Sequence, residues 1–174
     1  MTDASGSLKE VTLELGGKSP LIIFDDADFA SAIQGAQQAI YAGSGQSCVA
    51  GSRLLVQRSL HDRFIAALAE AQRRIRLGDP LDAATEMGPV ANARQFAHVR
   101  ELLAAGAASG ASVLAAERPA ALPERGFWVP PTLLAGLSNE ARPAREEIFG
   151  PVVAAIPFDD EAEAITLANR SRYG

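Results

Sequence analysis

The single cysteine of this 174-residue chain, Cys48, lies in a run of small and polar residues, Gly45-Gln46-Ser47-Cys48-Val49-Ala50-Gly51-Ser52-Arg53. A thiolate is a strong nucleophile. Small neighbours let a substrate approach the sulfur and leave backbone N–H groups free to stabilise developing negative charge. A lone cysteine is more often a small buried apolar residue. The residues alone therefore leave two interpretations of Cys48 open, a nucleophile and a core thiol.

Acidic side chains in two other segments could act with this thiol. Glu14 lies in Leu13-Glu14-Leu15-Gly16-Gly17-Lys18, where the simpler interpretation is an exposed acid at the end of a strand. Burial there would instead raise the pKa of the carboxyl group and suit it to act as a general base. The adjacent acids Glu146 and Glu147 are typical of a solvated turn. They precede Phe149 and a Gly-Pro turn, and an exposed aromatic side chain at such a place is less usual.

Other patterns do not favour metal or hydrolase chemistry. Neither His61 nor His98 has a partner at metal-binding spacing, and both are interpreted as surface side chains on helices. The chain has no Cys-x-x-Cys, His-Glu-x-x-His or Gly-x-Ser-x-Gly motif. Gly43-Ser44-Gly45 resembles the start of a dinucleotide-binding fingerprint, but it follows a predicted helix instead of a strand. We therefore predict no metal site.

The composition indicates one ordinary globular domain. Hydrophobic residues make up 48% of the chain and charged residues 21%, which excludes a disordered segment, and a single cysteine excludes a disulfide scaffold. The net charge of −5 argues against a nucleic-acid partner. The sequence shows no secretory leader and no apolar stretch of the roughly 20 residues that a membrane span needs. We expect a cytoplasmic protein with no membrane partner, because a lone cysteine fits a reducing compartment.

Short apolar runs alternate with helical patterns, which predicts an α/β domain with a mainly parallel sheet. Continuous apolar runs are typical of strands buried on both faces. The predicted strands are residues 21–24, 54–56, 112–114, 132–134 and 151–156. No internal repeat and no shift in composition marks a second domain.

Helix starts are predicted from capping residues. The expected starts are Asp28, Ser59 with Asp62 completing an acidic capping box, Asn92 with an end at Gly106 or Gly110, and Asp159 or Asp160. Residues 117–126 contain two prolines and mixed charge, and we predict a surface loop there.

Five segments resemble, in order, motifs of the NAD(P)-dependent aldehyde dehydrogenase superfamily. They are Val11-Thr12-Leu13-Glu14-Leu15-Gly16-Gly17-Lys18-Ser19-Pro20, the Cys48 segment, Gly78-Asp79-Pro80-Leu81, Met87-Gly88-Pro89-Val90 and Glu146-Glu147-Ile148-Phe149-Gly150-Pro151-Val152. The first looks like the family's glutamate motif and the second like its cysteine motif. The resemblance extends from about residue 8 to residue 174.

The resemblance implies a three-layer α/β/α catalytic domain that oxidises an aldehyde to a carboxylic acid. Cys48 would attack the aldehyde and carry a thiohemiacetal and then a thioester, with its backbone N–H as half of an oxyanion hole. Glu14 would activate the hydrolytic water. The implied cofactor is NAD or NADP, with Glu147 on the nicotinamide ribose and Phe149 near the nicotinamide ring. The backbone at Leu15 and Gly16 would lie beside the carboxamide.

The resemblance also implies a fragment. Family members are longer, so residues 1–174 are expected to be a partial catalytic domain that is truncated at both ends, without the Rossmann-like cofactor domain. Family members are homo-oligomers, and the oligomerisation arm is also expected to be missing. We therefore expect the chain alone to be inactive. Two alternatives stay open: a cofactor-independent thiol esterase that uses Cys48, and a non-enzymatic remnant that associates with a full-length partner. The motifs identify neither the aldehyde nor the choice between NAD and NADP.

Overall fold

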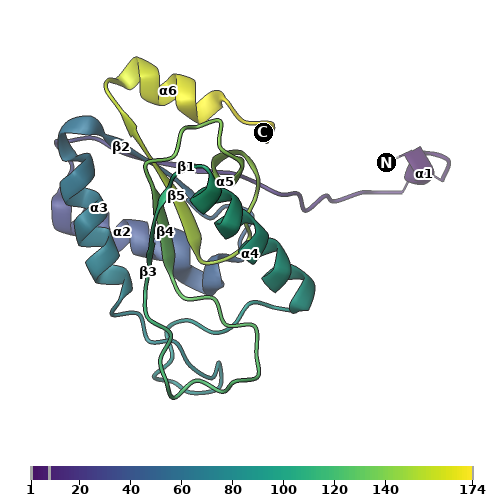
Figure 1. Cartoon of the computed structure of the whole chain (residues 1–174). Helices are drawn as coiled ribbons and strands as arrows, with labels where there is room; N and C mark the ends of the chain where they lie inside the picture. The colour runs from purple at the N-terminus through teal and green to yellow at the C-terminus, as the bar shows by residue number, and fades with distance from the viewer. Residues whose placement is uncertain (1, 8, 174) are drawn as a thin grey trace.

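A five-stranded sheet with helices on both faces forms the body of the molecule (Figure 1). The computed structural model describes residues 2–7 and 9–173. The strands are β1 (Pro20–Ile23), β2 (Arg53–Gln57), β3 (Ser112–Ala115), β4 (Thr132–Ala135) and β5 (Val152–Phe158). The helices are α1 (Thr2–Ser5), α2 (Phe29–Tyr41), the 3₁₀ segment η1 (Ala42–Gly45), α3 (Arg58–Gln72), α4 (Ala93–Ala108), α5 (Arg142–Arg145) and α6 (Glu161–Asn169).

The sheet has the strand order β1-β2-β5-β4-β3, and every neighbouring pair is parallel except β3 with β4. The central strands are buried on both faces, which is why they read as continuous apolar runs. The predicted mainly parallel α/β fold is confirmed. The one antiparallel strand, β3, lies at an edge, and its residues are largely exposed.

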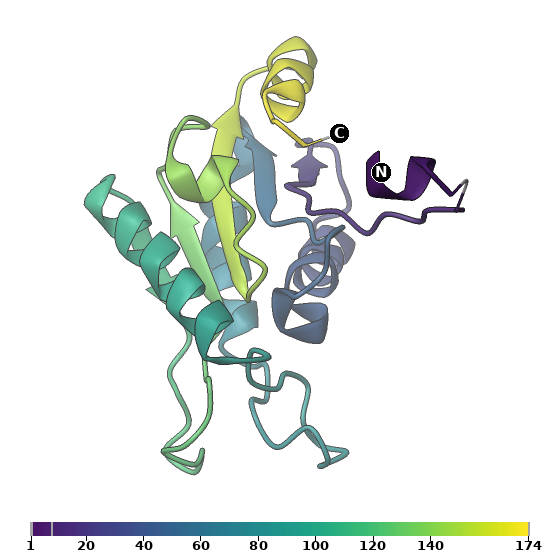
Figure 2. The ribbon, with the colours of Figure 1, turned by 90° about the vertical axis from the view of Figure 1, so that its right-hand side faces the viewer.

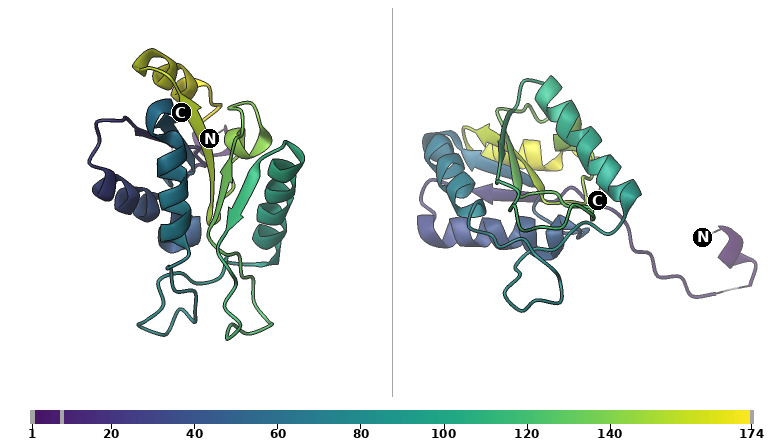
Figure 3. Two further views of the ribbon diagram at one scale, coloured as in Figure 1. Left: turned by 60° about the vertical axis from the view of Figure 1, so that its left-hand side comes forward. Right: turned by 60° about the horizontal axis from the view of Figure 1, so that its bottom comes forward.

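Two apolar cores lie on opposite faces of the sheet, so the predicted three-layer arrangement is confirmed. Helices α2 and α3 cover one face, with Ile40, Phe64 and Leu68 buried against β2 and β4. Helix α4 covers the other face, where Val99 and Leu102 are buried. Figure 3 shows the sheet between these two groups of helices, and the long loops that follow α3 and β3 extend beyond one end of it.

Three of the predicted helix caps are present. The side chains of Asp28, Asn92 and Asp160 each accept a hydrogen bond from the backbone N–H three residues on. The predicted capping box at Ser59 is wrong. Helix α3 begins at Arg58, and the Ser59 hydroxyl donates instead to the carboxylate of Asp25 across the loop that follows β1.

The prediction that His61 is a surface side chain is also wrong. Its side chain is only 12% exposed. His61 lines a groove beside α3, together with Ser112 of the edge strand β3 and Gly136. Its side chain is therefore partly buried in this groove and not freely exposed.

The N-terminal segment differs from the rest of the chain. Residues 9–19 form an extended coil that leads into β1, and helix α1 lies away from the body (Figures 1 and 2). Among the described residues, no helix is both long and apolar enough to cross a membrane.

Candidate functional site

Three segments with predicted site residues each end where a strand begins. Residues 9–19 lead into β1, residues 46–52 into β2 and residues 146–151 into β5. These strands are parallel neighbours, so the three segments meet at the same end of the sheet, where the strands begin. Ligand sites of open parallel sheets usually lie beyond the carboxyl ends of the strands. The candidate site of this protein lies at the amino ends.

An open cleft of about 460 Å³ lies where these segments meet. It brings together all six predicted site residues and two neighbours of the cysteine. The lining residues are Glu14, Leu15, Gly16, Gln46, Ser47, Cys48, Glu147 and Phe149.

Cys48 lies in a turn that is held open to the cleft. Gly43, Ser44 and Gly45 all have positive φ, and this left-handed run leads the chain out of α2. The Ser44 hydroxyl donates to the carbonyl of Gly88 (2.9 Å), which holds the run in place. The Cys48 side chain is half-buried, not a core residue. Among the described residues, its backbone N–H has no acceptor, which suits the expected role as an oxyanion donor.

Two glycines allow the glutamate segment to pack on the other two. A Cβ atom on Gly17 would overlap with the carbonyl oxygen of Cys48, and one on Gly16 would overlap with the Glu147 carboxylate. The Gly17 N–H donates to Oε1 of Glu147 at 3.0 Å. The lack of side chains at both positions therefore lets all three segments share one cleft.

Glu14 lines the cleft but is exposed, as the simpler sequence interpretation expected. The burial that would favour a general base is not observed in this chain. Leu15 beside it is 70% exposed, and Phe149, which also lines the cleft, is 36% exposed. The cleft therefore carries exposed apolar surface from two of its three segments.

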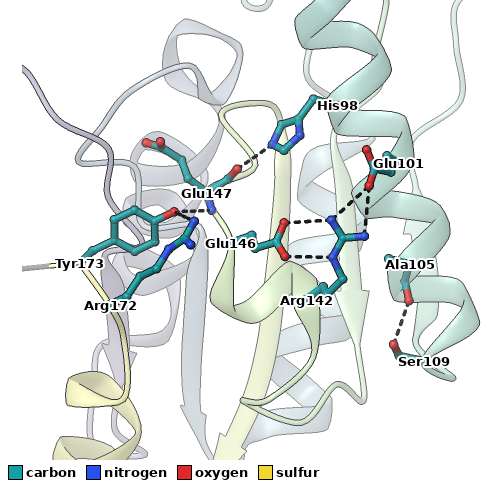
Figure 4. Close-up of polar contacts among 9 residues, drawn as sticks. All are labelled: His98, Glu101, Ala105, Ser109, Arg142, Glu146, Glu147, Arg172 and Tyr173. Carbon is teal, nitrogen blue, oxygen red and sulfur yellow. Dashed lines mark hydrogen bonds and ion pairs between the residues drawn. The ribbon is translucent and has the colours of Figure 1, made fainter.

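The backbone around Glu147 is held by side chains from distant segments (Figure 4). The Glu147 N–H donates to the Tyr173 hydroxyl at 3.2 Å, and its carbonyl accepts from Nε2 of His98 at 2.9 Å. His98 is therefore not the free surface histidine that the sequence predicted. Nε2 of Gln95 donates to the carbonyls of Ile148 and Phe149, both at 2.8 Å.

Phe149 has a φ of +51°, in the left-handed region. This conformation costs a residue other than glycine roughly 1–2 kcal/mol. The contacts made by Gln95 on both sides of Phe149 offset this cost.

Glu146, the neighbour of Glu147, points away from the cleft into an ion pair. Arg142 donates to both of its carboxylate oxygens (2.9 and 3.0 Å) and also contacts Glu101 on α4 (Figure 4). These hydrogen bonds lower the pKa of Glu146 below its ordinary value. The two adjacent acids therefore differ in role, since only the second lines the cleft.

Two buried basic residues, Lys18 and Arg53, were not predicted from the sequence. Lys18 is 2% exposed, and its Nζ has no hydrogen-bond partner among the described residues. Burial and the nearby Arg53 guanidinium lower the pKa of Lys18 to about 7, and the Glu147 carboxylate partly offsets this shift. Arg53 donates to the carbonyls of Lys18, Leu167 and Ala168. The only sequence signal for either residue was its position inside a family motif.

No group of histidine, cysteine and acidic residues suited to bind a metal occurs within residues 2–7 and 9–173. The site is thus a thiol, two carboxylates and an aromatic ring around a glycine-rich wall.

The fold and the cleft define a three-layer α/β domain with a thiol at the amino-terminal ends of its parallel strands. The chain belongs to the aldehyde dehydrogenase family, because the sequence pattern of the Aldehyde dehydrogenase family matches residues 1–174. The resemblance drawn from the motifs is confirmed. Betaine aldehyde dehydrogenase from Brucella ovis is 45% identical over 176 residues, which is 100% of this chain and 36% of that relative.

Solved structures agree with this assignment. Betaine aldehyde dehydrogenase from Staphylococcus aureus in complex with NAD+ superposes with a TM-score of 0.90 at 40% identity, over 99% of this chain and 35% of that one. HpcC from Thermus thermophilus superposes with a TM-score of 0.91 at 39% identity, over 99% of this chain and 35% of that one. The chain therefore spans about 36% of the length of the curated relatives that it matches.

Proposed function

We propose that this chain supplies the thiol and part of the nicotinamide-side wall of an NAD(P)-dependent aldehyde dehydrogenase. The observation that carries the proposal is the convergence of six residues in one open cleft: Glu14, Leu15, Gly16, Cys48, Glu147 and Phe149. The substrate is an aldehyde and the product the corresponding carboxylic acid. Betaine aldehyde is the first substrate to test, because several relatives are named for it.

Cys48 acts as the nucleophile in this proposal. Its sulfur adds to the aldehyde carbon, and the tetrahedral adduct places an oxyanion near the Cys48 backbone N–H. After oxidation, the same sulfur holds the acyl group as a thioester. The half-buried, cleft-facing position of the thiol supports this role over that of a core cysteine.

The other residues that line the cleft fit a nicotinamide nucleotide. When bound, NAD(P)+ supplies the hydride acceptor of the oxidation. Gly16 lines the cleft without a side chain, so its backbone is accessible to a bound group beside the Glu147 carboxylate. The Glu147 carboxylate offers an acceptor for ribose hydroxyls, and the exposed ring of Phe149 offers an apolar face.

Glu14 is the base for the last step. A carboxylate in the cleft can take a proton from the water that attacks the thioester carbon. The sulfur then leaves as thiolate and the acid is released. The exposure of Glu14 means that it meets solvent directly, which suits a residue that must recruit water.

A chimaera tests the proposal. Residues 9–173 would replace the matching segment of the Staphylococcus aureus enzyme. The formation of reduced nicotinamide would be followed by its absorbance, with betaine aldehyde and a wider panel of aldehydes as substrates. We expect activity that Cys48→Ala abolishes and Glu14→Gln reduces, while Ser112→Ala, at an exposed position on β3 that does not line the cleft, retains it. A folded chimaera whose activity is unaffected by Cys48→Ala would refute the proposal.

The 174-residue chain alone separates the alternatives. We expect weak binding of NAD+ and no useful turnover, because the chain spans only 36% of its relatives. Micromolar NAD+ binding by calorimetry would contradict that expectation. Hydrolysis of 4-nitrophenyl acetate that needs Cys48 but not cofactor would favour a thiol esterase. Concentration-dependent association without thiol reactivity would favour a non-enzymatic remnant.

A further inference from the structure

Four backbone groups of residues 147–149, the segment that carries Glu147 and Phe149, are bound by side chains. These are the N–H and C=O of Glu147, the C=O of Ile148 and the C=O of Phe149. Three of the four are carbonyls, and all three accept from helix α4. Such a concentration of side-chain donors on one loop is unusual, because most loop carbonyls face water.

The donors lie one helical turn apart on α4. Gln95 and His98 are three residues apart, so their side chains leave the same face of the helix. That face packs on the sheet layer, where Val99 is fully buried and a Cβ atom on Gly150 would lie 2.6 Å from its methyl carbon. The helix is therefore fixed against the loop that its side chains bind.

The chemistry of each donor is defined by its acceptor. A carbonyl oxygen can only accept, so His98 must carry a proton on Nε2 to make its 2.9 Å contact with Glu147. The single amide nitrogen of Gln95 has two hydrogens, and it serves two carbonyls at 2.8 Å each.

We infer that Gln95 and His98 are positioning residues, which hold the backbone of residues 147–149 so that the side chains of Glu147 and Phe149 face the cleft. We call these two residues the α4 clamp. This inference rests on the proposed function, because the clamp holds Glu147 and Phe149, the two residues proposed to contact the cofactor. It goes beyond that function because neither clamp residue lines the cleft.

The clamp explains how Phe149 keeps a left-handed backbone. At φ +51° a residue other than glycine returns to the extended region unless its neighbours prevent it. The Gln95 amide donates to the carbonyls of Ile148 and Phe149, which lie on either side of the Phe149 α-carbon. The backbone between them cannot rotate without breaking one of these hydrogen bonds.

Nuclear magnetic resonance of the 174-residue chain tests the clamp. Gln95→Glu keeps the shape of the side chain but replaces the donating amide with a carboxylate. We expect amide exchange at residues 147–150 and 152 to become about tenfold faster, the effect of losing roughly one net hydrogen bond or more. The Cα shift and amide coupling of Phe149 should lose their left-handed values. Gln34→Glu, the same change at an exposed position on α2, is the matched control.

His98 provides a second, independent pair of variants. His98→Phe keeps a ring without a donor, whereas His98→Gln restores an amide that can donate to Glu147. We expect His98→Phe to accelerate amide exchange in the loop and His98→Gln to restore slow exchange. A simple loss of packing would not be reversed in this way by glutamine. The ¹⁵N shifts of His98 should place its proton on Nε2. This pair also serves if Gln95→Glu does not fold.

Unchanged exchange at residues 147–150 and 152 in both Gln95→Glu and His98→Phe would overturn the clamp. So would a loss of protection that spreads equally to strand β2, because the residues would then be only structural. The KM for NAD+ of Glu147→Gln in the chimaera is a separate measurement. If that KM is unchanged, the proposed cofactor contact of Glu147 fails, whereas the exchange data still decide the clamp.

Discussion

The α-carbon of Gly17 lies so close to the carbonyl oxygen of Cys48 that no side chain fits between them. The glutamate segment therefore packs directly on the backbone that presents the thiol. Because the obstacle is backbone rather than a flexible side chain, a substitution must displace one of the two segments.

Gly17→Ala should therefore move the Cys48 turn. We expect the free energy of unfolding to fall by about 1–3 kcal/mol, as for other overpacking substitutions, and the rate of Cys48 alkylation by iodoacetamide to change. The matched control is Gly35→Ala on α2, where an added Cβ meets nothing within 4 Å. Alanine there should be neutral or stabilising, since it favours helix by about 1 kcal/mol over glycine. Equal effects of the two substitutions would contradict the close packing.

Lys18 should make stability depend on pH. Its pKa is lowered to about 7 in the folded protein, so between about pH 7 and 10.5 the unfolded chain binds more protons and stability rises with pH. Below about pH 7 the lysine is charged in both states, and its burial costs on the order of a few kcal/mol.

Lys18→Met removes this burial cost. We expect the variant to exceed the unaltered chain in stability most at about pH 6, and the difference to shrink by about pH 10, as measured by urea unfolding at both values. Lys9→Met changes the other lysine of the chain, which is exposed, and should show no such trend. A pH-independent difference for Lys18→Met would show that the buried ammonium is not the cause.

Glu147→Gln should weaken cofactor binding in the chimaera. In the proposed function, the carboxylate accepts charge-assisted hydrogen bonds from ribose hydroxyls, so its replacement should raise the KM for NAD+ about tenfold or more. Glu146→Gln is the neighbouring control, because Glu146 pairs with Arg142 away from the cleft. The pKa of Glu146 is lowered by this pairing, so the pairing stabilises the fold at neutral pH. The stabilisation is lost as the pH falls through the pKa of Glu146 in the folded protein. Equal KM values for both variants would argue against the role of Glu147.

Arg53→Lys should loosen the C-terminal end of α6. The guanidinium spans the carbonyls of Leu167 and Ala168 (both 2.7 Å) and of Lys18 (3.2 Å), which a single ammonium cannot do. We expect a loss of about 3 kcal/mol, since buried acceptors are left without donors. Hydrogen exchange should accelerate in α6 before β2. Arg94→Lys, an exposed arginine on α4, should leave both quantities unchanged.

Much of this molecule was predictable from the sequence, because the signals are local. Apolar runs predicted all five strands of the sheet, and Asp28, Asn92 and Asp160 marked three helix starts through hydrogen bonds within one turn. Ser59 failed as a cap because the nearby Asp25 carboxylate binds its hydroxyl. The five motifs identified the family, because their residue types and order are properties of the sequence alone.

The assembly of the site was decided only by the tertiary structure. Strand β5 inserts between β2 and β4, and this strand order brings the Glu147 segment beside the Cys48 segment, which is far from it in the chain. The roles of Gln95, His98 and Lys18 depend on contacts across these segments, so no local pattern could show them. Sequence determines the local conformations and the chemical groups available. Which groups meet depends on the free energy of packing the whole sheet, which no single segment contains.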